Sequence, residues 1–114
     1  MDQLLIKHKN IVREIIQEIA AMTPSDDTTE TQLIMDDERG HYILFSVGWQ
    51  GDLREYLPFV HIDVKPDAKV WLQHDGTDLR IAMWMVELGI PKSQIVLAFQ
   101  HPHRRLLIED FAIN

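Results

Sequence analysis

Hydrophobic residues recur at helical spacing near the start of the chain. Between residues 3 and 22 they form one stripe, which predicts an amphipathic helix: Leu4, Leu5, Ile11, Val12, Ile15, Ile16 and Ile19. His8 falls on the same stripe, so we expect it to pack at the edge of the core. The segment TPSDDTTE, residues 23–30, ends the helix with proline and small polar residues and predicts a flexible loop.

From residue 31 to residue 74 the hydrophobic period changes to two, which predicts about four β-strands. The first strand contains Leu33 and Met35, and the others are HYILFSVGW, YLPFVHIDV and KVWLQ, with turns such as DDERG and KPDA between them. Pro58 indicates a bulge or an edge position in the third strand, because proline cannot donate to a ladder. Consecutive strands with short connections predict an antiparallel meander.

The stretch HDGTD, residues 74–78, marks the change from strand to helix. Asp75 or Thr77 lies where an N-cap belongs, and Asp78 places a negative charge in the expected first turn. Gly76 permits the bend between the two elements. Because each residue has a structural role, we interpret this stretch as a boundary signal rather than as a catalytic site.

A second helix is predicted at about residues 77–88, with Gly89 at its C-cap. The apolar run SQIVLAF predicts a further C-terminal strand in a central or well-covered position. The predicted fold is therefore α+β: an N-terminal helix, an antiparallel meander, a second helix and a further strand. The length favours one domain over residues 1–114.

Charge and composition exclude several classes of protein. The chain has 18 Asp and Glu residues against 11 Lys and Arg residues, a formal net charge of −7, and no cysteine. Disulfides and thiol nucleophiles are therefore absent. Phosphate contacts need cations, so we do not expect direct DNA binding. A DNA-binding directionality factor is an alternative that requires these cations to share one face: Arg54, Lys65, Lys69, Arg104 and Arg105.

The chain shows no secretory leader pattern and no apolar run approaching the roughly 20 residues that span a bilayer. We therefore expect a cytoplasmic protein that does not enter the membrane.

The polar residues offer one weak candidate cluster. Acid–base chemistry could be built from four residues on the predicted third and fourth strands: His61, Asp63, His74 and Asp75. His61 and Asp63 alternate on one face of their strand, a face that is more typical of solvated or cross-strand pairs. No nucleophile elbow or phosphate-binding loop accompanies them. We therefore predict no enzymatic activity, and a small metal-dependent hydrolase or nuclease using this cluster is an alternative.

Metal binding is not predicted from the sequence, and neither is a cofactor. The closest histidine pair, His101 and His103, is interrupted by Pro102, and no acidic ligand completes it. His61 with Asp63, and His41 elsewhere, would contribute to a metal site only if the fold gathered them.

The strongest interaction signal lies in IAMWMVELGI. This helix is apolar on more faces than one sheet can cover, and Met and Trp are enriched at interfaces. Met83, Trp84 and Met85 are therefore the candidate interface, with a second copy of the chain or with another protein.

Three stretches together resemble the XisI family, the cyanobacterial fdxN element excision controlling factors: VGWQGDLREY, VHIDVKPDAKVWLQHDGTD and ELGIPKSQIVLAFQHP. The similarity runs from about Tyr42 to the C-terminus. It implies a small α+β accessory protein that acts with an XisH protein and an XisF site-specific recombinase in excising a DNA element during heterocyst differentiation. It implies no active-site residues. Residues 83–85 are more apolar than expected of the family's helix, which fits either a chain-specific partner or a local variation of the core.

Overall fold

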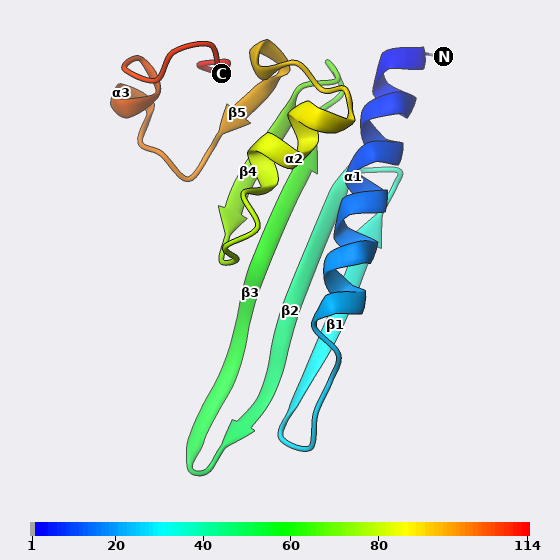
Figure 1. Cartoon of the computed structure of the whole chain (residues 1–114), viewed down its shortest axis with the longest axis vertical. Helices are drawn as coiled ribbons and strands as arrows, with labels where there is room; N and C mark the ends of the chain where they lie inside the picture. Colours follow the sequence, from blue (N-terminus) through cyan, green and yellow to red (C-terminus); the bar gives the residue numbers. More distant parts are fainter. Residues whose placement is uncertain (1) are drawn as a thin grey trace.

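The computed structural model describes residues 2–114, which form one five-stranded sheet with its main helices on one side (Figure 1). The strands lie in the order β1-β2-β3-β4-β5. The elements in chain order are α1 (Gln3–Met22), β1 (Thr29–Asp36), β2 (His41–Gln50), β3 (Leu53–Val64), β4 (Val70–Asp75), α2 (Ile81–Leu88), the 3₁₀ turn η1 (Lys92–Gln94), β5 (Ile95–Leu97) and α3 (Pro102–Arg105). The predicted α+β class and the predicted element order are confirmed.

The first four strands form the predicted antiparallel meander. β5 is parallel to β4 and lies at the edge of the sheet, so the alternative of a central position is wrong. Ile95 and Val96 are nevertheless fully buried. The C-terminal tail shields this edge, where the Ala112 N–H donates to the Ile95 carbonyl at 2.9 Å.

Pro58 lies at a bulge and also at a local edge of the sheet, and the sequence predicts one or the other. The register places Leu44 opposite Val60 and Phe45 opposite Pro58, so Phe59 is the extra residue. β4 pairs with β3 only from Val60 onward, which leaves Pro58 without a neighbour on that side. The β2–β3 hairpin continues beyond this point and extends past the end of α1 (Figure 1).

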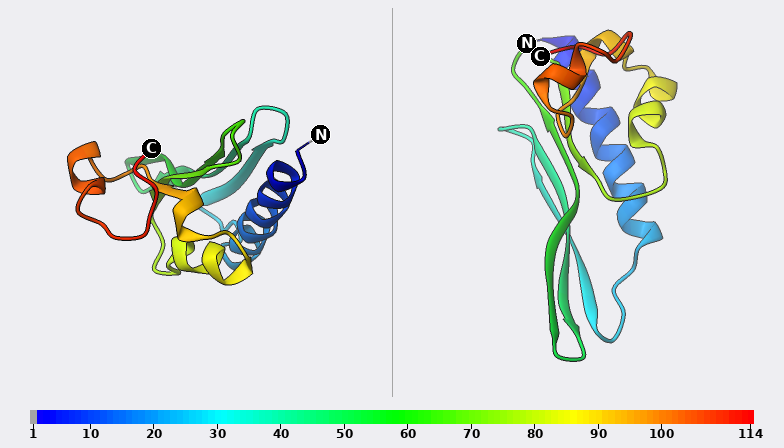
Figure 2. Two further views of the ribbon diagram at one scale, coloured as in Figure 1. Left: turned by 90° about the horizontal axis from the view of Figure 1, so that it is seen from above. Right: turned by 90° about the vertical axis from the view of Figure 1, so that its left-hand side faces the viewer.

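α1 and α2 cover the same face of the sheet, and no helix within residues 2–114 lies over the opposite face (Figure 2). The core lies between these helices and the sheet. It is aliphatic apart from Tyr42 and Met85, and its residues are Ile11, Val12, Ile15, Ile16, Ile19, Tyr42, Leu44, Val60, Ile62, Val64, Val70, Leu72, Ile81, Met85, Ile90 and Ile95. His8 packs deeper than the core edge expected for it, because it is fully buried and its Nδ1 lies 2.6 Å from the Ala68 carbonyl oxygen. No helix within residues 2–114 is long and apolar enough to cross a membrane.

α2 begins at Ile81, later than the predicted start near residue 77. Asp75 causes the delay: its Oδ1 accepts from the Thr77 N–H at 2.9 Å, which forms a turn, while its Oδ2 accepts from the Ile81 N–H at 3.2 Å. Asp75 therefore accepts a hydrogen bond from the first N–H of α2 across the intervening loop. Asp78 lies in that loop and not in the first turn as predicted.

The two glycines that flank this segment have different roles. Gly89 adopts φ 115° at the C-cap of α2, and the following N–H, of Ile90, bonds to the Met85 carbonyl at 3.0 Å, as predicted for this cap. Gly76 does not have the positive φ of a glycine bend. It is needed for close approach, because a Cβ there would lie 2.9 Å from the Phe59 carbonyl oxygen.

Candidate functional site

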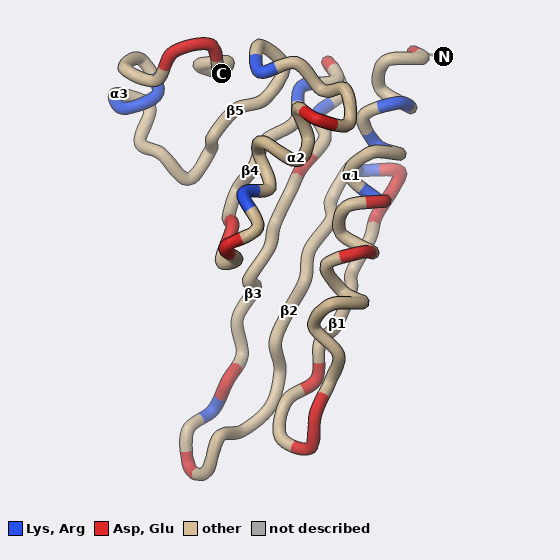
Figure 3. Tube along the Cα trace, in the orientation of Figure 1, with Lys and Arg blue, Asp and Glu red and all other residues tan. Residues whose placement is uncertain are grey.

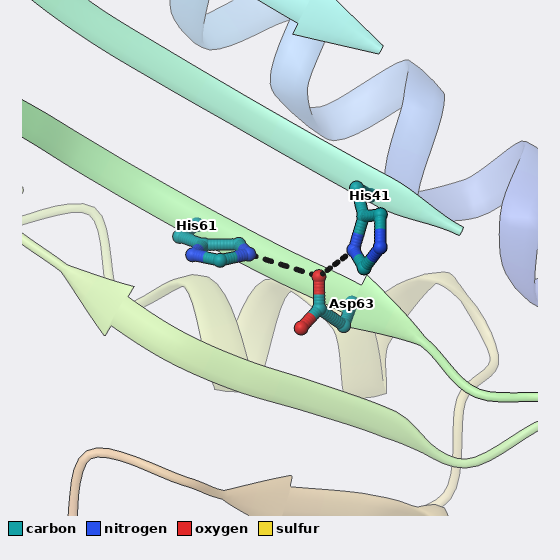
Figure 4. Close-up of side chains that lie close together, drawn as sticks. All are labelled: His41, His61 and Asp63. Carbon is teal, nitrogen blue, oxygen red and sulfur yellow. Dashed lines mark hydrogen bonds and ion pairs between the residues drawn. The ribbon is translucent and has the colours of Figure 1, made fainter. Parts of the chain in front are cut away.

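The face of the sheet without helices carries a polar cluster at the end of β3 (Figure 4). His61 and Asp63 lie two residues apart on β3 and point to one face, and His41 on β2 is directly opposite Asp63. His41 Nδ1 lies 2.7 Å and His61 Nε2 lies 2.9 Å from the same carboxylate oxygen, Asp63 Oδ1. Two histidines therefore converge on one carboxylate oxygen.

Asp63 is buried although it is charged, and its hydrogen bonds compensate for that burial. Its second oxygen, Oδ2, accepts from Gln73 Nε2 at 3.1 Å. Burial alone would raise the pKa of Asp63, but the His41 hydrogen bond, the charge and hydrogen bond of His61, and the Gln73 hydrogen bond together lower that pKa below its usual value. The carboxyl group therefore stays ionised at neutral pH.

Of the four residues in the predicted polar cluster, only His61 and Asp63 are hydrogen-bonded to each other. His74 pairs with His61 across the strands but is exposed and lies outside the Asp63 hydrogen bonds. Asp75 bonds to the start of α2 instead. The proposed acid–base set of His61, Asp63, His74 and Asp75 is therefore not assembled.

From the sequence, His41 joins His61 and Asp63 only if the fold gathers them, and Gln73 is not predicted to be part of the cluster. The register of β2 against β3 supplies His41. A bulge between His61 and Ile62 leaves Gln73 as the extra residue of β4, within reach of Asp63. The alternating pattern in KVWLQ carries no signal of that bulge.

The candidate interface residues of α2 divide between core and surface. Met85 is fully buried in the core and is not accessible to a partner in this fold. Trp84 is partly buried and packs against the core, and Met83 is partly exposed. Met83 and Trp84 line a shallow hollow of about 350 Å³, which we call the α2 hollow; its lining residues are Leu79, Arg80, Met83, Trp84 and Glu87.

The cations required for direct DNA binding do not gather in one patch, because Arg54 is separated along the sheet from Lys65 and Arg105. Lys65 and Arg105 both lie over the ring of Trp71, at 5.3 and 5.4 Å from its centroid. Arg54 lies over Trp49 in the β2–β3 hairpin. This hairpin forms the end of the sheet that is remote from both chain termini (Figure 1). Arg105 also donates to the carbonyl oxygens of Gln100 and Ala98, so its guanidinium is engaged within the chain.

The fold and its site define a small α+β protein with a meander covered by helices on one face only. The family description "XisI protein" matches residues 1–113, and the chain therefore belongs to the XisI family.

Two solved structures from Anabaena variabilis ATCC 29413 share the fold. A XisI-like protein is 39% identical, with a TM-score of 0.90 and coverage of 96% of this chain and 99% of that one. The fdxN element excision controlling factor XisI is 31% identical, with a TM-score of 0.87 and coverage of 98% of this chain and 100% of that one. No curated protein matches the sequence. The resemblance seen in the sequence is thus confirmed over nearly the whole chain.

Proposed function

We propose that this chain is a non-enzymatic accessory factor that controls the site-specific excision of a DNA element. The observation that carries the proposal is family membership over residues 1–113. A structure described as an fdxN element excision controlling factor matches 98% of the chain at a TM-score of 0.87. The family relationship implies an XisH-like protein and an XisF-type recombinase as its partners.

The charge of the chain favours action through proteins rather than through DNA. At a formal net charge of −7, long-range electrostatics oppose approach to the phosphate backbone. We therefore assign DNA contact to the recombinase and protein contact to this chain.

The α2 hollow is the surface that we assign to the XisH-like partner. It combines the apolar side chains of Met83 and Trp84 with the charged rim of Arg80 and Glu87, an arrangement typical of interfaces. Trp84 is anchored against the core, so it presents a rigid aromatic surface at low entropic cost.

The polar cluster supports a non-enzymatic role. The two oxygens of Asp63 already accept three hydrogen bonds, from His41, His61 and Gln73. These donors hold the carboxylate in place and lower the pKa of Asp63, which makes it a weaker general base than an ordinary aspartate.

Co-purification from the native host tests the interface. We expect tagged wild-type chain to retain the XisH-like protein, and Met83→Lys to reduce the retained amount at least about tenfold, because a charge would then face the apolar part of the hollow. Leu107→Lys is the matched control, since Leu107 is 82% exposed in the tail, away from α2.

Thermal melts of both variants should match the wild type to within a few degrees. Retention of the partner by Met83→Lys at the wild-type level would contradict the assigned surface. Excision is tested separately with a reporter element in cells that lack the chain. Unchanged excision there would contradict the proposed function itself.

A further inference from the structure

We propose that His41, His61 and Asp63 form a binding site for a divalent first-row transition-metal ion. The proposal rests on the geometry of the cluster and does not depend on a role in excision. One ligand atom from each of the three residues lies within 4.8 Å of the others. These atoms come from neighbouring strands of a sheet, so the backbone holds them in register before any ion arrives.

The distances require only small side-chain movements. A zinc ion bonded at about 2.0–2.1 Å to two nitrogens at the tetrahedral angle holds those nitrogens about 3.3–3.4 Å apart. The ligand atoms of the cluster lie within 4.8 Å of one another, so the two histidine nitrogens need to approach by at most about 1.5 Å. Asp63 Oδ1 already lies 2.7 Å from His41 Nδ1 and 2.9 Å from His61 Nε2. An ion entering beside Oδ1 therefore meets all three atoms after rotations that leave the strands in place.

The surroundings of Asp63 supply the orientation that metal sites need. Gln73 holds Oδ2 at 3.1 Å, which fixes the carboxylate plane and leaves Oδ1 directed at the two histidines. Burial of Asp63 strengthens the attraction of its charge for a cation, because the local dielectric is low.

The outer side of the site is open to solvent. The His41 side chain is 45% exposed and that of His61 is 30% exposed, so an ion can enter from water. Three protein ligands leave at least one coordination position for water or for a group from another molecule.

The ligand types determine the class of ion. Two imidazoles and one carboxylate favour Zn²⁺ and its first-row neighbours, whereas Mg²⁺ and Ca²⁺ prefer all-oxygen sites. Each imidazole binds the ion through the nitrogen that now faces Asp63, and its remaining proton resides on the other ring nitrogen.

Calorimetric titration of the purified chain with Zn²⁺ alone, in a non-chelating buffer, tests the proposal. We expect one Zn²⁺ per chain and a fall in affinity of more than about tenfold in both His41→Ala and His61→Ala. Titration with Co²⁺ should produce visible absorption bands in the wild type that both variants lose. Gln73→Leu, which keeps the three ligands, should weaken Zn²⁺ binding by about 10–100-fold.

His103→Ala is the matched control. His101 and His103 are the other close histidine pair, with ring centroids 4.8 Å apart, so this variant removes a competing exposed pair. It should bind Zn²⁺ as the wild type does, and excess Mg²⁺ should not compete. Circular dichroism confirms that each variant is folded. The proposal is overturned if the wild type binds no stoichiometric Zn²⁺, if a folded His41→Ala variant binds it unchanged, or if His103→Ala abolishes binding.

Discussion

Single aspartates organise the turns and helix starts of this chain. Asp2 Oδ1 accepts from the Leu4 N–H at 2.9 Å and begins α1, and Asp75 bridges β4 to α2. Asp26 organises the turn before β1, where its Oδ1 accepts from the N–H groups of Thr28 and Thr29, both at 2.8 Å. The loop predicted at residues 23–30 ends at residue 28, because β1 begins at Thr29, and hydrogen bonds to Asp26 and Ser25 organise the connection.

Asp26 should titrate far below an ordinary aspartate. The backbone hydrogen bonds from Thr29 and Thr28 lower its pKa from 3.8 to about 2. Because the folded pKa is depressed, the stabilisation is fully present above the unfolded value and is lost as the pH falls through about 2. Two-dimensional NMR of the Thr28 and Thr29 amides should show a midpoint near pH 2, which Asp26→Asn removes. A midpoint near 3.8 would show that these bonds do not form in solution.

At the scale of elements, the start of α2 depends on Asp75 rather than on a residue adjacent to the helix. Replacing Asp75 by Ala removes the acceptor for the Ile81 N–H and for the turn at Thr77. We expect a loss of about 0.5–2 kcal/mol in the free energy of unfolding. Urea denaturation measures this loss.

Asp78→Ala is the control for this prediction. Asp78 is exposed in the loop before α2, so its removal should change stability by less than about 0.5 kcal/mol. An equal loss in both variants would mean that charge near the helix start matters more than the specific hydrogen bonds of Asp75.

The hydrophobic period predicts which elements occur more accurately than it predicts the residues at which they begin and end. α1 was predicted at its observed bounds, because its apolar stripe is continuous and Pro24 follows it. α2 was placed too early, because an aspartate that forms an Asx turn has the same local sequence as one that caps a helix. The apolar run of β5 predicts a central or well-covered position, and only the tertiary position of the tail shows that it is an edge strand that is covered.

The cluster around Asp63 shows the same limit at the scale of a site. Alternation along β3 places His61 and Asp63 on one face from sequence alone. Adding His41 requires the register of β2 against β3, and a shift of one residue would move His41 to the helix-covered face. Gln73 requires the bulge in β4 as well. The part of the site that is local in sequence was thus predictable, and the part that depends on pairing was not.

At the scale of the whole molecule, the sheet is covered on one face and the other face carries aromatic and aliphatic side chains toward the hairpin. Trp49 is 53% exposed and Tyr56 is 64% exposed there, with Arg54 lying over both rings. Acidic residues are distributed over the turns and over α1 (Figure 3).

This charge distribution predicts weak and unselective binding to duplex DNA. The formal net charge is −7, and the Lys65–Arg105 pair on Trp71 is too small to neutralise more than a few phosphates. Fluorescence anisotropy at about 0.15 M salt should give dissociation constants no tighter than the roughly 10⁻⁶–10⁻⁴ M of non-specific binding, similar for unrelated sequences. Tight, sequence-selective binding that is lost in a Lys65→Ala, Arg105→Ala double variant would contradict this prediction. It would support the directionality-factor alternative, since those two residues are the cations that the fold brings together.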